Sequence, residues 1–170
     1  MPRIIAGCYG GLPLKTPGGR QTRPTADRVK EAMFSAITAR LDLEGTAVLE
    51  LFAGSGQLGL EALSRGAARV TWVDKDPAAQ RAIRENLQKV GRLTDPALQL
   101  LSCSAEAAYR LLTQPGSPRF DLILADPPYQ QAEAFFAAWQ ARACWQRLLK
   151  PAGLLVFEEP SPAERRRIRP

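Results

Sequence analysis

Residues 48–59 read Val-Leu-Glu-Leu-Phe-Ala-Gly-Ser-Gly-Gln-Leu-Gly, an apolar run of strand type that leads into glycines spaced G-x-G-x-x-G. A helical stretch follows at residues 60–65, and a second strand-type run at residues 69–73 ends in Asp74. Glycines at this spacing permit a tight turn and let a ligand approach the backbone at the N–H-rich start of a helix. The pattern predicts a nucleoside-binding α/β unit in which Asp74 binds two ribose hydroxyls, with a solvated strand-end carboxylate as the alternative.

A second motif lies at residues 120–129, which read Phe-Asp-Leu-Ile-Leu-Ala-Asp-Pro-Pro-Tyr. Pro127 and Pro128 fix φ and lack N–H donors, so the backbone cannot continue a strand ladder there. The carbonyls of Asp126 and Pro127 are expected to point outward beside the Asp126 carboxylate, and Tyr129 offers a flat ring. These residues predict a pocket for a planar group that carries an NH₂, such as a nucleobase amine; a plain strand-ending turn is the alternative.

The glycine loop and Asp74 fit a dinucleotide as well as other adenosine-containing cofactors. Glu50 favours S-adenosylmethionine, because a carboxylate at the end of the first strand would repel a pyrophosphate but attract the methionine ammonium group. The alternative is an acid that caps the following turn. In open α/β sheets ligands bind outside the carboxyl ends of the strands, so the glycine loop and the Asp-Pro-Pro-Tyr motif are expected to face one crevice.

Strand-type and helix-type segments alternate after residue 46. We expect strands at residues 47–52, 69–73, 97–101, 121–125 and 154–158, and helices at residues 58–64, 78–90, 105–113 and 132–149. This alternation predicts an α/β fold, with a mostly parallel sheet and helices on both faces. Trp139 and Trp145 are expected to pack along the last helix rather than stack on bases.

The first forty residues are expected to add a β-hairpin and a helix to this unit. Residues 3–6 and 12–15 can pair across the turn at Gly10 and Gly11, and Thr25 can cap a helix over residues 26–40. The expected inner face of that helix carries Val29, Met33, Ala36 and Ile37.

Nearly all of the net charge of +6 lies in this N-terminal segment, where seven basic residues face two acidic ones. Such a segment is expected to follow a phosphate backbone and to bind RNA in a salt-dependent way, although a solvated surface without a partner is the alternative. The Arg165–Arg167 cluster is expected to be a solvated end. The candidate RNA contacts are Arg3, Lys15, Arg20, Arg23, Arg28 and Lys30.

The composition of the 170 residues suits one domain with a sizeable core. No stretch looks like a signal peptide or a membrane span, and three scattered cysteines suit neither a zinc cluster nor a disulfide framework. The absence of histidine excludes histidine-based catalytic triads and histidine-ligated metals. We therefore expect a cytoplasmic, monomeric protein that holds no metal.

The two motifs resemble those of class I amino methyltransferases, and three further segments resemble the RsmD family. These are Arg-Ile-Ile-Ala-Gly at residues 3–7, Thr-Arg-Pro-Thr-Ala-Asp-Arg-Val-Lys-Glu-Ala-Met-Phe at residues 22–34, and Leu-Gly-Leu-Glu-Ala-Leu-Ser-Arg-Gly-Ala at residues 58–67. The resemblance runs from residue 3 to about residue 159. It implies a Rossmann-like fold and S-adenosylmethionine-dependent methylation of a guanine N2 in 16S ribosomal RNA, within the small subunit.

The resemblance also implies roles for particular residues. Asp126 and the Pro127 carbonyl would hold the amine, and Tyr129 would stack on the flipped base. Ser104, or less favourably Glu106, would contact the adenine, although relatives often carry an acidic residue at that strand end. The expected cofactor contacts are Glu50, Phe52, Ala53, Gly54, Ser55, Gly56, Gly59, Asp74, Lys75, Ser104, Ala105 and Asp126.

A departure from the family lies at the C-terminal end, where relatives usually add a strand pair after the fifth strand. Residues 160–164 read Pro-Ser-Pro-Ala-Glu, so that pair is expected to be missing and one sheet edge to be exposed. The expected organisation is a basic extension at residues 1–40, a catalytic unit at residues 41–159 and an arginine-rich tail at residues 160–170, within one structural domain.

Three other functions remain open at this point. Asp-Pro-Pro-Tyr serves adenine-N6 methylation of DNA equally well. The glycines alone fit a nicotinamide-dependent oxidoreductase. A non-catalytic RNA-binding assembly factor with a retained cofactor site fits the short C-terminus.

Overall fold

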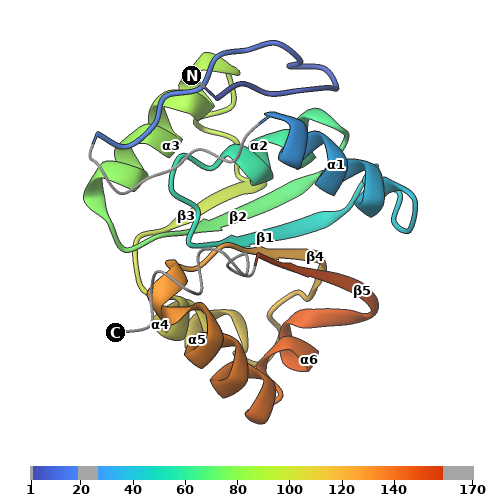
Figure 1. The fold of residues 1–170 in the computed structure, drawn as a ribbon, viewed down its shortest axis with the longest axis vertical. Coiled ribbons are helices and arrows are strands. Elements are labelled where there is room, and N and C mark those ends of the chain that lie inside the picture. The colour runs from blue at the N-terminus through green and yellow to red at the C-terminus, as the bar shows by residue number, and fades with distance from the viewer. Residues whose placement is uncertain (1, 19–26, 159–170) are drawn as a thin grey trace.

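The computed structural model describes residues 2–18 and 27–158, and its centre is a five-stranded parallel sheet (Figure 1). The strands are β1 (Ala47–Leu51), β2 (Arg69–Val73), β3 (Leu98–Leu101), β4 (Phe120–Ala125) and β5 (Leu149–Phe157). β1 is buried along its whole length and has no alternation of polar and apolar faces, because helices cover both sides of the sheet. The expected parallel α/β architecture is confirmed.

The strand order is β3-β2-β1-β4-β5. The chain therefore adds β2 and β3 on one side of β1 and then adds β4 and β5 on the opposite side. Leu51, the last residue of β1, pairs in register with Val73 of β2 and Ala125 of β4, and Ala125 pairs with Phe157 of β5. The residues that follow these strands therefore lie at one edge of the sheet. Beside β1 this edge forms the crevice in which α/β folds bind ligands.

The helices divide into two layers. α1 (Asp27–Thr38), α2 (Gln57–Ser64) and α3 (Pro77–Lys89) lie on one face of the sheet together with the N-terminal segment, and the other three helices cover the opposite face (Figure 1). The second layer comprises α4 (Ala105–Leu112), α5 (Tyr129–Ala141) and α6 (Cys144–Leu148). Each layer has its own buried cluster against the sheet.

The N-terminal segment forms an antiparallel pair, as expected, but without regular strands. A single bridge joins Arg3 to Pro13, and the N–H of Ile4 donates to the carbonyl of Leu12 at 3.0 Å. Ile4 and Leu14 are fully or almost fully buried, which attaches the segment to the core.

Helix α1 buries only part of the face that we expected, since Ile37 is buried but Ala36 is exposed. Lys30, Phe34 and Ile37 point inward, whereas Val29 is 49% exposed. The expectation for Val29 was wrong because hydropathy places lysines in solvent, whereas here Lys30 is the first buried residue of the inner face and Val29 points away from it. The proposed cap, Thr25, lies outside the described residues.

The single long helix expected at residues 132–149 is two helices. α5 ends at Ala141, and Ala143 adopts a left-handed conformation with φ of 52° before α6 begins. The sequence carries no glycine or proline at this break, so local turn chemistry could not reveal it. β5 in turn begins at Leu149, earlier than expected, and among the described residues it pairs only with β4.

Candidate active site

The loop after β1 turns sharply because three of its residues adopt left-handed conformations. Phe52, Gly54 and Gly56 have φ of 58°, 54° and 72°. A non-glycine residue in this region costs about 1–3 kcal/mol and persists only where the surroundings hold it. The Phe52 ring packs edge-on against Phe135 at 4.9 Å between ring centroids. This contact anchors the loop to α5, so the turn is a built feature of the crevice.

The carboxylate of Glu50 stabilises the start of helix α2. It is 3% exposed and accepts the N–H groups of Gly59 at 2.7 Å and Leu58 at 3.3 Å. Burial, together with the charges of nearby Asp126 and Asp74, raises the pKa of Glu50 to about 8 against the opposing effect of these two N–H groups. The structure thus gives Glu50 the alternative role of a turn-capping acid. Its contact with a cofactor stays a prediction.

The glycines of the loop have different reasons to be glycine. A Cβ on Gly59 would lie 2.4 Å from the Trp72 indole nitrogen and 2.8 Å from a Glu50 carboxylate oxygen, so Gly59 allows α2 to pack closely on the sheet. A Cβ on Gly54 would meet no atom within 4 Å. Gly54, rather than Gly59, therefore borders open space in which a ligand can approach the backbone.

Asp74 lies directly after β2 and is tied to this loop. One carboxylate oxygen accepts the N–H of Gly54 at 2.8 Å, and the other accepts the N–H of Asp76 at 2.9 Å. Each oxygen can accept a further hydrogen bond. Asp74 thus lies beside Gly54, as its predicted ribose-binding role requires, and the exposed Lys75 follows it.

At the end of β3, Ser104 caps helix α4. Its hydroxyl oxygen accepts the N–H of Ala107 at 3.2 Å, while Ala105 is buried and Glu106 is exposed. The hydroxyl proton of Ser104 remains available to a ligand acceptor. The adenine contact expected of Ser104 is compatible with this cap and stays a prediction.

Asp126 lies at the same edge of the sheet, directly after β4. Burial, together with the negative charge of Glu158, raises the pKa of Asp126 to about 7. The N–H of Glu158 donates to the carbonyl of Ala125 at 3.0 Å, so this second acid follows β5 where Asp126 follows β4. Within residues 2–18 and 27–158, no side chain forms a hydrogen bond or ion pair with the Asp126 carboxylate. It is an acceptor available at the crevice.

The two prolines end β4 and begin α5. Pro127 is buried, and Pro128 directly precedes the first helical residue, Tyr129. The carbonyl of Pro128 accepts the N–H of Gln131 at 2.8 Å. The Tyr129 side chain lies outside the described part of the structure, so its stacking role stays a prediction.

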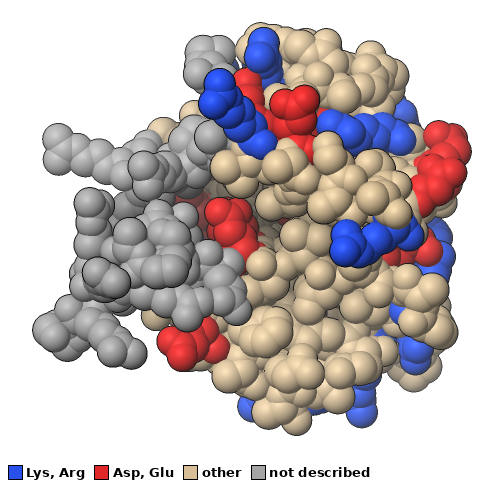
Figure 2. Space-filling view, turned by 45° about the vertical axis from the view of Figure 1, so that its right-hand side comes forward, with Lys and Arg blue, Asp and Glu red and all other residues tan. Residues whose placement is uncertain are grey.

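Of the six basic residues expected to contact RNA, three are exposed, one is buried and two lie outside the described residues. Arg3, Lys15 and Arg28 are exposed, and Arg3 pairs with Asp27 at 2.9 Å. Figure 2 shows basic side chains over the upper part of one face, with acidic side chains among them. Arg20 and Arg23 lie outside the described residues.

Lys30 was wrongly assigned to this surface. Its side chain is fully buried, donates a hydrogen bond to the Arg3 carbonyl and lies 3.8 Å from a carboxylate oxygen of Glu61. Burial lowers the pKa of Lys30, and the Glu61 charge opposes this shift. A lysine enclosed in this way cannot reach an RNA phosphate, and its role is to join α1 to α2.

Two buried polar residues on this side of the sheet, Glu61 and Asn86, were not among the predicted site residues. Glu61 accepts the N–H groups of Ile5 at 2.7 Å and Ala6 at 3.0 Å and pairs with Arg65 at 2.8 Å. Asn86 bonds to the backbone of the N-terminal segment and of the glycine loop. The only hint for Glu61 was its place in the family-like segment at residues 58–67.

Among residues 2–18 and 27–158, no helix is long and apolar enough to cross a membrane. No cluster of three or more histidine, cysteine, aspartate or glutamate side chains that could hold a metal ion occurs in the same ranges.

The chain is similar to known proteins over most of its length. The family model described as "Conserved hypothetical protein 95" matches residues 2–168. A Haemophilus influenzae protein named "Ribosomal RNA small subunit methyltransferase D" is 36% identical over 166 residues, which cover 92% of this chain and 77% of that protein. The Escherichia coli K12 protein of the same name is 35% identical over 129 residues, 76% of this chain and 61% of its own length.

Solved structures give the same picture. A hypothetical protein of Thermus thermophilus superposes with a TM-score of 0.78 and 30% identity, over 94% of this chain and 86% of that one. The structure titled "Putative methyltransferase yhhF from Escherichia coli" superposes with a TM-score of 0.63 and 31% identity, over 91% of this chain and 76% of that one.

Proposed function

This chain belongs to the family described as conserved hypothetical protein 95, the RsmD family, and we propose that it methylates the exocyclic N2 amine of a guanine in 16S ribosomal RNA. Its fold is the Rossmann-like fold of class I methyltransferases. The observation that carries the proposal is the available Asp126 carboxylate, which follows β4 beside the glycine loop and precedes two prolines.

The residues of the glycine loop fit S-adenosylmethionine as the cofactor. Gly54 borders open space, and the Asp74 carboxylate next to it has lone pairs left for two ribose hydroxyls. Glu50 and Asp126 bring two carboxyl groups with raised pKa values to the crevice, and a ligand that carries positive charge would favour their ionised forms. The bound cofactor supplies an electrophilic methyl group on its sulfonium, so the protein has mainly to bind, orient and exclude water.

The chemistry of the amine explains why acceptors are needed. The lone pair of guanine N2 is delocalised into the ring, which makes it a poor nucleophile. In its ionised form Asp126, together with the Pro127 carbonyl, accepts the two N2 hydrogens and favours a pyramidal nitrogen. The same acceptors stabilise the positive charge that develops on nitrogen as the methyl is transferred. The methylated amine then loses a proton readily, so Asp126 need not be a strong base.

Binding of the RNA is the role of the N-terminal layer. Arg3, Lys15 and Arg28 are exposed, and we assign phosphate contacts to them and to Arg20 and Arg23. Such contacts weaken as salt rises. The extruded guanine would then reach the crevice, where Tyr129 stacks on it. We further propose that the enzyme works in the cytoplasm as a monomer without a metal.

The test is incubation with labelled S-adenosylmethionine and small ribosomal subunits from cells that lack this activity, followed by nucleoside analysis. We expect labelled N2-methylguanosine from the wild type. Asp126→Ala should lose transfer by at least about a hundredfold, the scale of lost transition-state acceptors, while keeping cofactor affinity. Labelled N6-methyladenine in a parallel incubation with DNA, or normal transfer by Asp126→Ala, would overturn the assignment.

A further inference from the structure

Asn86 is a fully buried side chain on α3 that the proposed chemistry does not use. Its Oδ1 accepts the N–H of Lys15 at 2.7 Å, and its Nδ2 donates to the carbonyls of Lys15 and Ser55, both at 3.0 Å. Since one contact needs an acceptor and two need a donor, the orientation of the amide is fixed by its partners. Asn86 therefore bridges two stretches of backbone that are 40 residues apart in sequence.

The two stretches belong to different binding regions. Ser55 lies between Gly54 and Gly56, in the left-handed turn that borders the cofactor crevice. Lys15 lies in the N-terminal segment, five residues before Arg20. The amide thus connects the segment assigned to RNA directly to the loop assigned to the cofactor.

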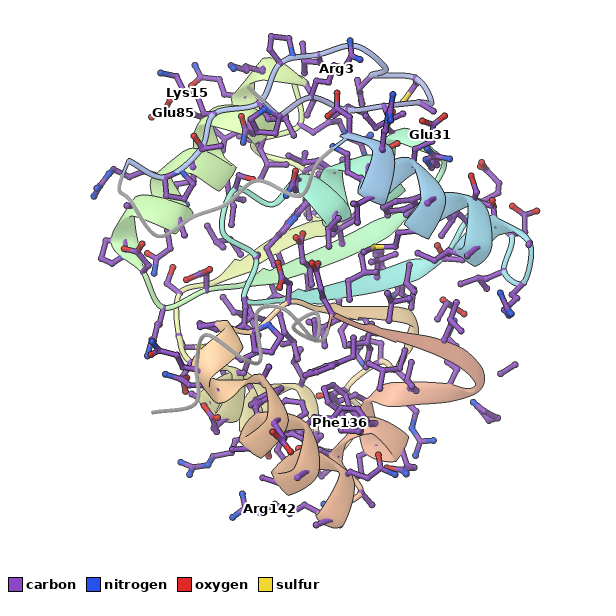
Figure 3. The ribbon with its side chains drawn as sticks, viewed as in Figure 1. Arg3, Lys15, Glu31, Glu85, Phe136 and Arg142 are labelled. Carbon is purple, nitrogen blue, oxygen red and sulfur yellow. The ribbon has the colours of Figure 1, made fainter. Side chains whose placement is uncertain are left out.

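A small hollow lies on the outer side of this bridge. It has a volume of about 140 Å³ and is formed by residues 15–18 and the first turns of α3. The exposed side chains of Lys15 and Arg81 line it, together with Glu85, which Figure 3 shows beside Lys15. Two cations against one acid leave a net positive hollow, a place where an RNA phosphate can bind.

We propose that Asn86 is a positioning residue that couples RNA binding to cofactor binding. A phosphate held beside Lys15 fixes the Lys15 backbone, which through the Asn86 amide fixes the Ser55 carbonyl and the turn around it. The coupling is reciprocal, so the cofactor in turn strengthens RNA binding. This inference rests on the proposed function, because it takes ribosomal RNA and an adenosine cofactor as the two ligands.

The physical basis is the cost of ordering the loop. A turn with three left-handed residues must be held in one conformation before a ligand can use its N–H groups, and whichever ligand orders it first lowers the cost for the second. Removal of the amide would leave the Lys15 N–H and the Ser55 carbonyl without this partner, which loosens both stretches.

The experiment measures the affinity of S-adenosylhomocysteine, which prevents turnover, by calorimetry with and without unmodified 16S ribosomal RNA. We expect the RNA to tighten binding to the wild type by about tenfold, within the usual range for coupled sites. In Asn86→Ala the factor should fall towards one. In Asn86→Asp it should fall as well, because a carboxylate keeps the acceptor for Lys15 but faces two carbonyls without a donor.

Lys89→Met is the matched control. Lys89 lies on the same helix and donates to the Pro13 carbonyl at 2.9 Å, so it also attaches the N-terminal segment to α3. Among the described residues, no hydrogen bond joins its side chain to the glycine loop. The control should keep the tenfold factor, although it should weaken RNA binding slightly through the loss of one charge.

Hydrogen exchange on the wild type provides a measurement that needs no variant. RNA alone should slow exchange of the Gly54 and Gly56 amides. An unchanged coupling factor in folded Asn86→Ala, loss of coupling in Lys89→Met, or unchanged exchange at these amides would each overturn the inference. If the protein methylates ribosomal subunits but RNA does not tighten cofactor binding, this inference alone is wrong. If RNA tightens cofactor binding but no methyl group is transferred, the proposed function is wrong instead.

Discussion

The two layers that cover the sheet both have an apolar buried cluster, but they differ in what else is buried there. On the α4–α6 side the core is aromatic: Trp139 lies 4.7 Å from Phe135 and 4.8 Å from Trp145, measured between ring centroids. On the α1–α3 side three polar residues, Lys30, Glu61 and Asn86, are completely buried, and each bonds to the backbone of the N-terminal segment.

The difference follows from what each layer has to hold. Helices α4–α6 present large apolar faces, and burial of those faces stabilises them without fixing direction. Residues 2–15 form only one isolated bridge, so directional hydrogen bonds fix the position of their backbone in addition to the burial of Ile4 and Leu14. Loss of an aromatic side chain should therefore act mainly on stability, whereas loss of a buried polar group should also change where the N-terminal segment lies.

The largest expected effect tests the aromatic layer. Trp139→Ala should lower the free energy of unfolding by about 4 kcal/mol, because it leaves a large cavity among Tyr109, Phe135 and Trp145. Urea unfolding followed by circular dichroism measures this loss. Trp145→Phe is the control, expected to cost less because most of the apolar volume remains. A loss under about 1 kcal/mol for Trp139→Ala would break the comparison.

The second prediction tests the polar layer. Glu61→Gln should lower the free energy of unfolding by about 3 kcal/mol, since it removes the partner of a buried lysine. It should also speed hydrogen exchange of the Ile5 and Ala6 amides. Trp139→Ala should leave these amides slow when the two variants are compared at the same free energy of unfolding. The double variant Lys30→Met with Glu61→Gln should be less destabilised than the sum of its parts. Strict additivity would show that the buried pair does not couple α1 to α2.

The third prediction concerns the crevice where the layers meet. The pKa values of Asp126, about 7, and Glu50, about 8, both lie above their ordinary values, so the folded state binds more protons than the unfolded chain. Stability should therefore fall as pH rises from about 4 to 8, by roughly 1 kcal/mol from Asp126 after allowance for its partial exposure. Asp126→Asn should flatten the curve between pH 4 and 7. A curve that rises over that range would contradict this sign.

Much of the architecture could be predicted because its causes are local. The apolar runs at residues 48–51 and 120–125, the glycine spacing after the first and the two prolines after the second each act within a few residues. Together with the preference of helices and strands to alternate around a parallel sheet, they fix the strand positions to within a few residues. Ala143 shows the limit, since its left-handed turn has no local sequence signature.

By itself, the sequence determined the fold class and the edge of the sheet where the chemistry lies. The carboxyl ends of parallel strands share one edge of the sheet, so motifs that directly follow the strands meet there. Only the tertiary structure decided that Lys30 is buried, that Gly59 serves packing and that Glu61 and Asn86 hold the N-terminal segment. The reason is distance along the chain, since Ile5 and Glu61 are 56 residues apart and Lys15 and Asn86 are 71 apart. Local propensities depend on neighbouring residues, so they cannot specify which distant backbone group a buried polar side chain binds.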